Sequence, residues 1–154
     1  MTMTWLAALI LVQTPAPIGS EKLPCDLATL KAMDQAEVRV SENGKTVIYR
    51  GVPLALLLEK RVKEARTMPG MKSLSDAVLL VRGADGYQAA YSAAAVAMDA
   101  PGERYLLAIE RDGEPLDKGF GPIRMIVPGD PKHARWVREV EGVRLVRLDK
   151  LVEP

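Results

Sequence analysis

Polar and apolar residues alternate along two neighbouring stretches that a tight turn separates. Residues 37–41 place apolar side chains at every second position, and residues 46–49 resume this β-prone pattern. Asn43-Gly44 lies between them, and Asn-Gly between two such runs is the strongest short-range signal of a β-hairpin. The pattern therefore predicts an antiparallel hairpin with its turn at Asn43-Gly44.

Other strands are predicted where apolar runs are bounded by turn residues. The continuous Val- and Leu-rich run at residues 77–82 is typical of a buried strand, and Asp85-Gly86 indicates a second hairpin with residues 87–92. An alanine-rich segment, residues 93–98, follows. The remaining predicted strands are residues 105–110, ending in a turn at Asp112-Gly113, residues 123–127 and residues 143–148.

Two stretches are predicted to be helical. Asp26 is placed to cap a short helix that runs to about Met33. Pro53 suits a first helical position, where a missing N–H costs nothing, and it begins a predicted amphipathic helix over residues 53–65. The residues predicted to pack this helix on the sheet are Leu54, Leu57 and Leu58.

The order of these elements predicts the fold class. About seven short strands and two or three helices follow one another without the regular alternation of a doubly wound parallel sheet. We therefore expect an α+β fold, with a mixed, mostly antiparallel sheet of short strands and flanking helices.

The N-terminal stretch indicates export. The apolar run at residues 5–12 is shorter than the roughly 20 residues needed to cross a bilayer, and small residues and prolines follow it. Residues 1–19 are therefore predicted to be a signal peptide, with a single domain over residues 20–154 and a periplasmic or secreted location. The alternative is an apolar N-terminal strand or helix that belongs to the fold.

Charge and cysteine content exclude some classes of protein. The net charge of +1 argues against a nucleic-acid binder, which needs a concentrated excess of Lys and Arg. Nothing after the leader predicts a stable membrane span. Cys25 is the only cysteine, so it makes no internal disulfide, and it is interpreted either as a buried, inert thiol or as a site of intermolecular pairing.

A cluster of cations follows the strand at residues 123–127. Pro128-Gly129-Asp130-Pro131 breaks the strand, and residues 132–138 then carry three cations and a histidine around Trp136. A rigid turn lined with cations is suited to holding an anion. The alternative interpretation is a buried strand and a core tryptophan with solvated charges around them.

Four stretches in order carry a resemblance to a known family. Residues 121–129 read Gly-Pro-apolar-Arg-three apolar-Pro-Gly, and residues 132–137 read basic-His-x-basic-Trp-Val. With residues 49–59, 83–87 and 106–116, they resemble the molybdopterin-binding oxidoreductase domain of the sulfite oxidase type. The resemblance covers most of the chain after about Leu27, in a shorter version than the full-size enzymes.

The resemblance implies a molybdopterin cofactor and places its metal ligand on the first hairpin. In the family, the pterin dithiolene and one cysteine thiolate hold molybdenum. The corresponding stretch here, residues 38–43, has no cysteine, and Ser41 is the nearest match. A serine hydroxyl is a poorer ligand than a thiolate, so we expect molybdenum to be held weakly or not at all.

The resemblance also assigns the cation cluster to the cofactor. The family's pterin ends in a phosphate, and the basic-His-x-basic-Trp segment lies beside it. The matching candidate residues are Lys132, His133, Arg135 and Trp136, with Gly129 allowing close backbone approach. Tyr87 and Tyr91 are further candidates, for which cross-strand packing is the alternative.

Three functions are compatible with the sequence. The first is an exported molybdopterin-binding, oxidoreductase-like domain whose activity is in doubt because the metal-ligating cysteine is unmatched. The second is a non-catalytic periplasmic binding or partner-interaction module that keeps the fold. The third is a structural or partner-binding envelope protein. A redox or envelope protein is the expected partner.

The leader gives the first testable prediction. Because residues 1–19 are predicted to be removed on export, the mature protein should begin between residues 17 and 20. N-terminal sequencing of protein recovered from the periplasm checks this expectation. A mature chain that begins at Met1 or Thr2 would contradict it.

Overall fold

The computed structural model describes residues 19–59, 63, 74–98 and 104–148, which form two antiparallel β-sheets and three short helices. The predicted signal peptide lies outside the described residues, except for Gly19, and stays a prediction. No helix among the described residues is long and apolar enough to cross a membrane.

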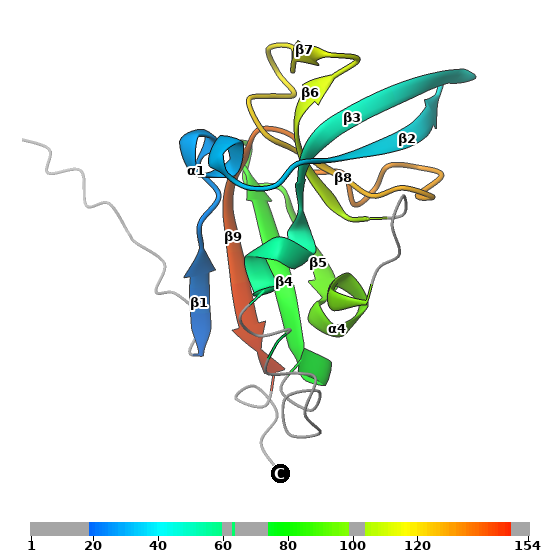
Figure 1. Ribbon diagram of the computed structural model, residues 1–154. Helices are drawn as coiled ribbons and strands as arrows, with labels where there is room; N and C mark the ends of the chain where they lie inside the picture. Colours follow the sequence, from blue (N-terminus) through cyan, green and yellow to red (C-terminus); the bar gives the residue numbers. More distant parts are fainter. Residues whose placement is uncertain (1–18, 60–62, 64–73, 99–103, 149–154) are drawn as a thin grey trace, which may run out of the picture.

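The first sheet has four strands in the order β1-β9-β4-β5 and forms the lower part of the molecule in Figure 1. All of its pairings are antiparallel. Its strands are β1 (Ser20–Leu23), β9 (Val140–Arg147), β4 (Ala77–Gly83) and β5 (Gln88–Ser92). Strand β4 alternates buried and less buried residues although its apolar run is continuous, whereas β9 buries Val143, Leu145 and Val146.

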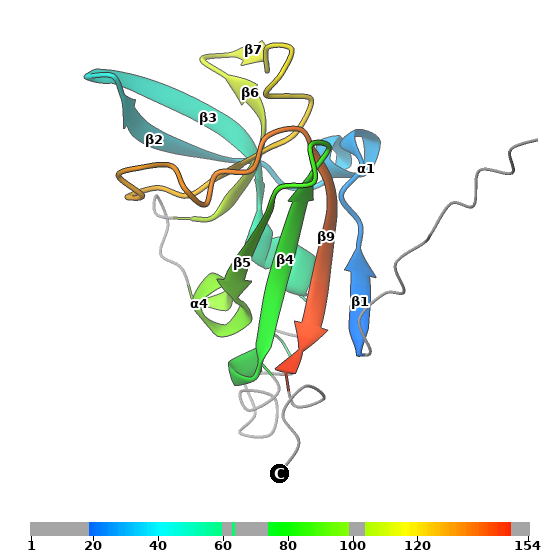
Figure 2. The same ribbon diagram turned by 180° about the vertical axis from the view of Figure 1, so that it is seen from behind.

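The second sheet has five strands, and its β2–β3 hairpin extends away from the first sheet (Figures 1 and 2). Strands β2, β3, β6 and β7 follow in that order, and β8 pairs with β6. Their bounds are β2 (Ala36–Glu42), β3 (Lys45–Pro53), β6 (Leu106–Arg111), β7 (Glu114–Pro115) and β8 (Arg124–Ile126).

Both predicted hairpins are confirmed. Glu42 pairs with Lys45, and Asn43 and Gly44 between them have φ of 51° and 75°, which is the positive-φ geometry that favours Asn-Gly. Strands β4 and β5 pair across the turn that contains Gly86, whose φ is 83°. Turn chemistry is local, so the sequence alone was sufficient to place these two turns.

Three short helices with assigned bounds lie within the described residues, in agreement with the predicted two or three. Helix α1 (Leu27–Ala32) is capped by Asp26, which accepts a hydrogen bond from Thr29 N at 2.9 Å, as predicted. The other two are η1 (Leu54–Leu58) and α4 (Ala93–Ala97). Every described strand pairing is antiparallel, so the prediction of a mostly antiparallel sheet is confirmed. The prediction of an α+β fold with flanking helices is corrected to a sheet-rich fold, because hairpin turns join β2 to β3, β4 to β5 and β6 to β7 without a helix between them.

The helix predicted over residues 53–65 starts as one 3₁₀ turn, η1. Leu54 and Leu58 are fully buried, whereas Leu57 is only partly buried and packs against the core. Glu59 and Lys63 continue in helical conformation and form an ion pair, and residues 60–62 and 64–65 lie outside the described part. Helices η1 and α4 contact one another on one face of the first sheet (Figure 1).

Strand β1 was not predicted, because its sequence, Ser-Glu-Lys-Leu, lacks an apolar period. It pairs with β9, from Ser20 with Val146 to Leu23 with Val143. Cys25 follows and is 6% exposed, and burial raises the pKa of its thiol. A buried, protonated thiol is the inert alternative of the two considered for this residue.

A β-bulge bends strand β3 where the two halves of the molecule meet. The register between β3 and β6 shifts between Arg50 and Gly51. A Cβ atom built on Gly51 would lie 2.1 Å from the carbonyl oxygen of Leu107 and 2.6 Å from Cα of Ala108. Only glycine allows this approach, since the neighbouring atoms are backbone of the central strand β6.

Gly51→Ala should therefore destabilise the fold by about 1–3 kcal/mol or more, the usual cost of overpacking a core position. Chemical denaturation measures the free energy of unfolding. Gly142→Ala is the matched control, because nothing lies within 4 Å of a Cβ at Gly142. Equal effects of the two substitutions would show that the close approach at the bulge is unimportant.

Candidate functional site

A cavity of about 460 Å³ opens beside the tip of the β2–β3 hairpin. Three segments that are far apart in the sequence meet there: the hairpin, the connection from β6 to β8, and the loop after β8. The lining residues are Ser41, Glu42, Asn43, Arg111, Leu116, Asp117, Phe120, Arg124, Pro131, Lys132 and His133. The cavity thus joins the predicted metal position to part of the predicted cation cluster.

Alternation along β2 decides which side chain the hairpin directs inward. Val38 and Val40 are buried, and Glu42 continues the same face with a side chain that is 15% exposed. Ser41 lies on the opposite face, is exposed, and pairs with the exposed Thr46. Ser41 therefore reaches only the edge of the cavity, and Glu42 is the inward-facing residue at this end of the strand.

Glu42 is the centre of a charged hydrogen-bond network. Its Oε1 accepts a hydrogen bond from Tyr49 Oη at 2.8 Å, and its Oε2 accepts one from Arg111 Nη2 at 3.1 Å. Arg124 Nη1 lies 3.8 Å from Oε1 and donates to Tyr49 Oη at 2.8 Å. Because each polar group is held by another, the network fixes the positions of both arginines.

Tyr49 contributes the buried hydroxyl group of this network. The residue is fully buried, and burial together with its hydrogen bond to Glu42 raises the pKa of its hydroxyl to about 12. The phenol therefore stays protonated at physiological pH and donates to Glu42. The same oxygen accepts from Arg124, so one hydroxyl orients both an anion and a cation of the site.

Arg124 is also enclosed by aromatic rings. Its guanidinium carbon lies 4.6 Å from the centre of the Phe120 ring and 5.1 Å from that of Trp136. The side chain is only 12% exposed. Its Nε, like that of Arg111, is buried and has no hydrogen-bond partner in the described part of the chain. A guanidinium group that lines a cavity is a chemical match for an anionic ligand.

His133 lies against the tryptophan of the same loop. The two rings are stacked, with centres 3.7 Å apart and planes 10° apart. The backbone of His133 has φ of 50°, a left-handed conformation that is uncommon outside glycine. Such strained residues cluster at binding and catalytic sites. The loop thus presents the imidazole at the cavity wall, next to Lys132.

The other predicted residues of the cation cluster are not among those that line the cavity. Arg135 makes two hydrogen bonds to the carboxylate of Asp130, at 2.9 and 3.2 Å. Trp136 is buried and donates from Nε1 to Val127 O at 2.9 Å. Gly129 has φ of 79° in the turn before them. In this structure these three residues shape the loop, whereas Lys132 and His133 reach the cavity.

Tyr87 and Tyr91 hold the same loop onto the first sheet. Their hydroxyl groups donate to the carbonyl oxygens of Ala134 and Arg135, respectively. Burial raises the pKa of the Tyr91 hydroxyl, so it remains a donor. Neither tyrosine is among the residues that line the cavity. Their contacts position the loop that carries Lys132.

Sequence reasoning missed three residues of the site: Glu42, Arg111 and Arg124. Arg124 stands inside the Gly-Pro-x-Arg motif that carried the resemblance, so its position was available as a signal. Glu42 could have been found by extending the alternation of Val38 and Val40 by one step. Arg111 also stands in a stretch that carried the resemblance, residues 106–116, but its contact with Glu42 spans 69 residues and could not be read from the sequence.

The donor atoms present do not suit a molybdenum ion. Cys25 lines a different cavity, with Lys22, Pro122 and Glu141, so no thiolate faces the site. Among the described residues, no group of three or more His, Cys, Asp or Glu side chains is arranged to hold a metal ion. The phosphate end of a pterin cofactor, by contrast, fits the cations of the cavity.

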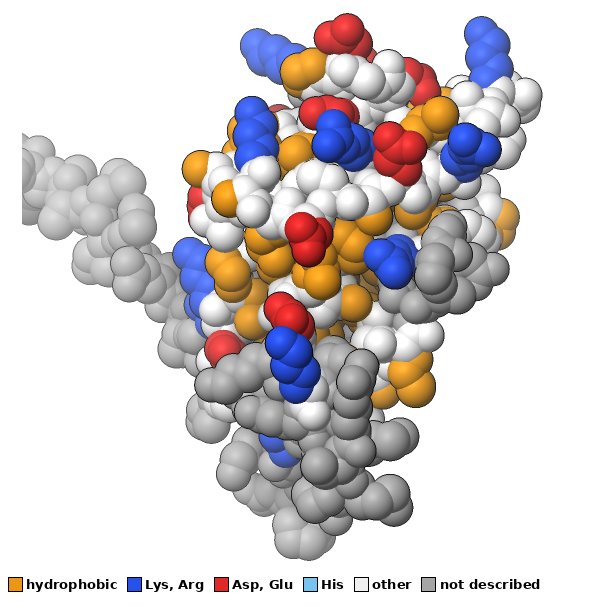
Figure 3. Space-filling view, viewed as in Figure 1, with side chains coloured by type: hydrophobic (Ala, Val, Ile, Leu, Met, Phe, Trp, Pro, Cys, Tyr) orange, Lys and Arg blue, Asp and Glu red, His pale blue; other side chains and the backbone are white. Residues whose placement is uncertain are grey.

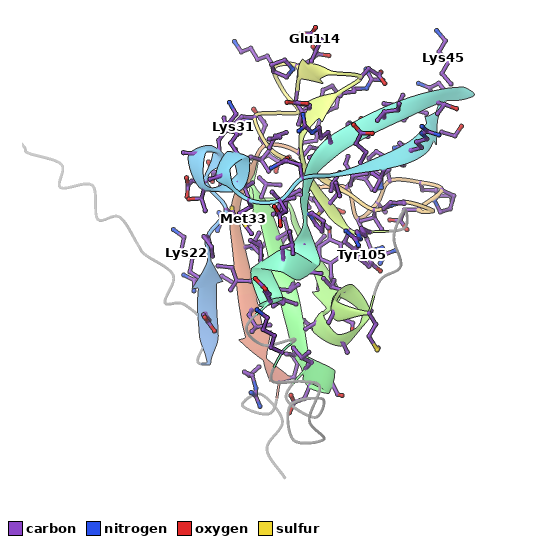
Figure 4. All side chains as sticks on the ribbon, in the orientation of Figure 1. Lys22, Lys31, Met33, Lys45, Tyr105 and Glu114 are labelled. Atoms are coloured by element: carbon purple, nitrogen blue, oxygen red, sulfur yellow. The ribbon has the colours of Figure 1, made fainter. Side chains whose placement is uncertain are left out.

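Charges on the surface of the second sheet are mixed in sign on one face of the molecule. On the face seen in Figure 3, Lys and Arg side chains over the second sheet are interspersed with Asp and Glu, and they form no continuous basic patch there. Lys45 at the hairpin tip points into solvent, away from the body of the protein (Figure 4).

Comparison with known proteins identifies the domain. The model of the oxidoreductase molybdopterin binding domain matches residues 20–149, which is most of the chain. The match includes both sheets and the whole cavity. A comparison with curated proteins found no match.

The Asp130–Arg135 pair makes the stability of the loop depend on pH. Hydrogen bonds from Arg135 hold the pKa of Asp130 below its usual value. Its stabilising contribution is therefore complete above the unfolded pKa of about 3.9, and is lost as pH falls through the lower folded pKa. The difference in the free energy of unfolding between wild type and Asp130→Asn should therefore become smaller below about pH 4.

Chemical denaturation at several pH values between about 2 and 6 measures this difference. Asp34→Asn is the control, since Asp34 is exposed and far along the chain from the loop. A difference between wild type and Asp130→Asn that stays constant through the acid range would exclude the pair as a source of acid sensitivity.

Proposed function

Since the chain belongs to the family of oxidoreductase molybdopterin binding domains, we propose that it is an exported member of the sulfite oxidase type that binds a phosphate-bearing pterin without a protein ligand to molybdenum. Its function would then be that of a cofactor-binding module. An envelope protein remains the proposed partner.

The observation that carries this proposal is the convergence of three cations on one cavity. Arg111, Arg124 and Lys132 come from three separate segments and all line it. Guanidinium groups make forked hydrogen bonds with phosphate oxygens, and an ammonium group adds a point charge. Contacts with Tyr49 and Phe120 hold the Arg124 side chain in place before a ligand binds, which reduces the conformational entropy lost on binding.

The size and the ring content of the cavity also support a pterin. Its volume of about 460 Å³ falls within the range of about 300–1,000 Å³ that small-molecule sites occupy. Phe120 and His133 place rings at its wall, and planar heterocycles pack well against rings. A simple inorganic anion would need neither feature.

The absence of a protein ligand to molybdenum is proposed from the chemistry at the first hairpin. Ser41, the residue in the position of the family's cysteine, is exposed on the outer face of β2. The inward position is Glu42, whose two oxygens are already held by Tyr49 and Arg111. The alternative of a fully loaded oxidoreductase therefore has less support.

The proposal predicts bound pterin with little molybdenum. The full chain is expressed in a host that makes the cofactor and in a strain blocked in its synthesis. Pterin is measured by fluorescence after oxidative release, and molybdenum by mass spectrometry. Protein from the competent host should carry pterin and clearly less than one molybdenum per chain.

Charge removal tests whether this pterin lies in the cavity. Lys132→Gln with Arg111→Gln should lower pterin retention by roughly 100-fold or more, because each charge-assisted contact is worth about 1.5–3 kcal/mol. Arg39→Gln is the matched control, since Arg39 lies on the exposed face of β2. Equal pterin in all variants, or none in the wild-type protein, would overturn the proposal.

A further inference from the structure

We propose that Glu42 is a resident counter-ion of the cavity, which occupies the arginines in the absence of ligand and thereby weakens the binding of simple anions. This inference rests on the proposed function, because it concerns the same anion-binding cavity. It adds a determinant of selectivity, supplied by the inward-facing neighbour of Ser41, which is the nearest match to the family's cysteine.

The geometry shows how completely Glu42 engages the arginines. One carboxylate oxygen is 3.1 Å from Arg111 Nη2, and the other is 3.8 Å from Arg124 Nη1. The first of these pairs is a direct charge-assisted hydrogen bond. Two of the three cations that line the cavity are thus already partnered, and only Lys132 makes no ion pair within the described part of the chain.

Burial increases the effect of this carboxylate. The side chains of Glu42 and Arg124 are 15% and 12% exposed, so solvent screens their interaction only weakly. An anion that reaches Arg124 must share its guanidinium with Glu42 or displace the carboxylate. Either event brings like charges together in a site of reduced dielectric constant, which lowers affinity.

The same carboxylate favours ligands that carry hydrogen-bond donors. A ligand with an N–H group beside its anionic group can donate to Glu42 while its anion contacts Lys132. Glu42 therefore discriminates between a simple phosphate compound and a phosphate-bearing heterocycle. The selectivity arises because the Glu42 carboxylate repels an anion that has no hydrogen-bond donor to offer it.

Isothermal titration calorimetry with inorganic pyrophosphate tests the inference. Glu42→Gln should bind pyrophosphate at least about tenfold more tightly than wild type, since removing the competing charge frees both arginines. Glu110→Gln is the matched control. Glu110 also pairs with an arginine, Arg50, at 3.5 Å, but it does not line the cavity. The Glu110→Gln variant should therefore bind pyrophosphate as tightly as wild type does.

Glu42→Asp separates charge from packing, because it keeps the carboxylate and shortens the side chain. We expect pyrophosphate affinity within about twofold of wild type for this variant. Unfolding midpoints of all variants are measured in parallel. If Glu42→Gln does not fold, the comparison of Glu42→Asp with Glu42→Ser decides, and only the neutral variant should show the gain.

The outcomes separate this inference from the proposed function. Binding of pyrophosphate by wild type with no gain in Glu42→Gln would overturn the counter-ion inference and leave the cavity as an anion site. An equal gain in Glu42→Asp would overturn it too, since packing and not charge would then be responsible. No binding by any variant, together with no retained pterin, would overturn both proposals.

Discussion

The site depends on the hydroxyl group of one buried tyrosine. Tyr49 on β3 donates to Glu42 on β2 and accepts from Arg124 on β8, so a single oxygen links three strands of the second sheet. Its ring also packs edge-on against Trp136, with ring centres 6.0 Å apart. A buried polar network is stable only when its members are satisfied together. The hairpin, the short strand β8 and the loop after it are therefore fixed as one unit around the cavity.

The loop after β8 is held by contacts along its length. Trp136 donates to Val127 O across the base of the loop, and Asp130 binds Arg135 within it. Tyr91 reaches the carbonyl of Arg135 from the first sheet. Backbone strain at His133 persists because these contacts determine its conformation. The two sheets thus cooperate: one carries the hairpin side of the cavity, and the other holds the opposing loop in place.

Family membership and the local chemistry lead to different conclusions about the metal. The match over residues 20–149 establishes a molybdopterin-binding oxidoreductase domain, and the cations of the cavity agree with an anionic cofactor. At the hairpin, however, the inward position holds a carboxylate that is neutralised by arginine. Core packing and site chemistry involve different residues, so membership of the family does not by itself fix the side chains at the cavity.

The sequence by itself determined the features that depend on local interactions. Asn43-Gly44 and Asp85-Gly86 specified their hairpins through turn geometry, and Asp26 specified the start of α1. Only the tertiary structure decided which charges meet at the cavity: it brought Arg111 to Glu42 and Arg124 to Tyr49, across 69 and 75 residues. Strand β1 and the bulge at Gly51 likewise exist through partners far away in the chain. These features follow from contacts between distant residues, for which a single sequence carries no periodic signal.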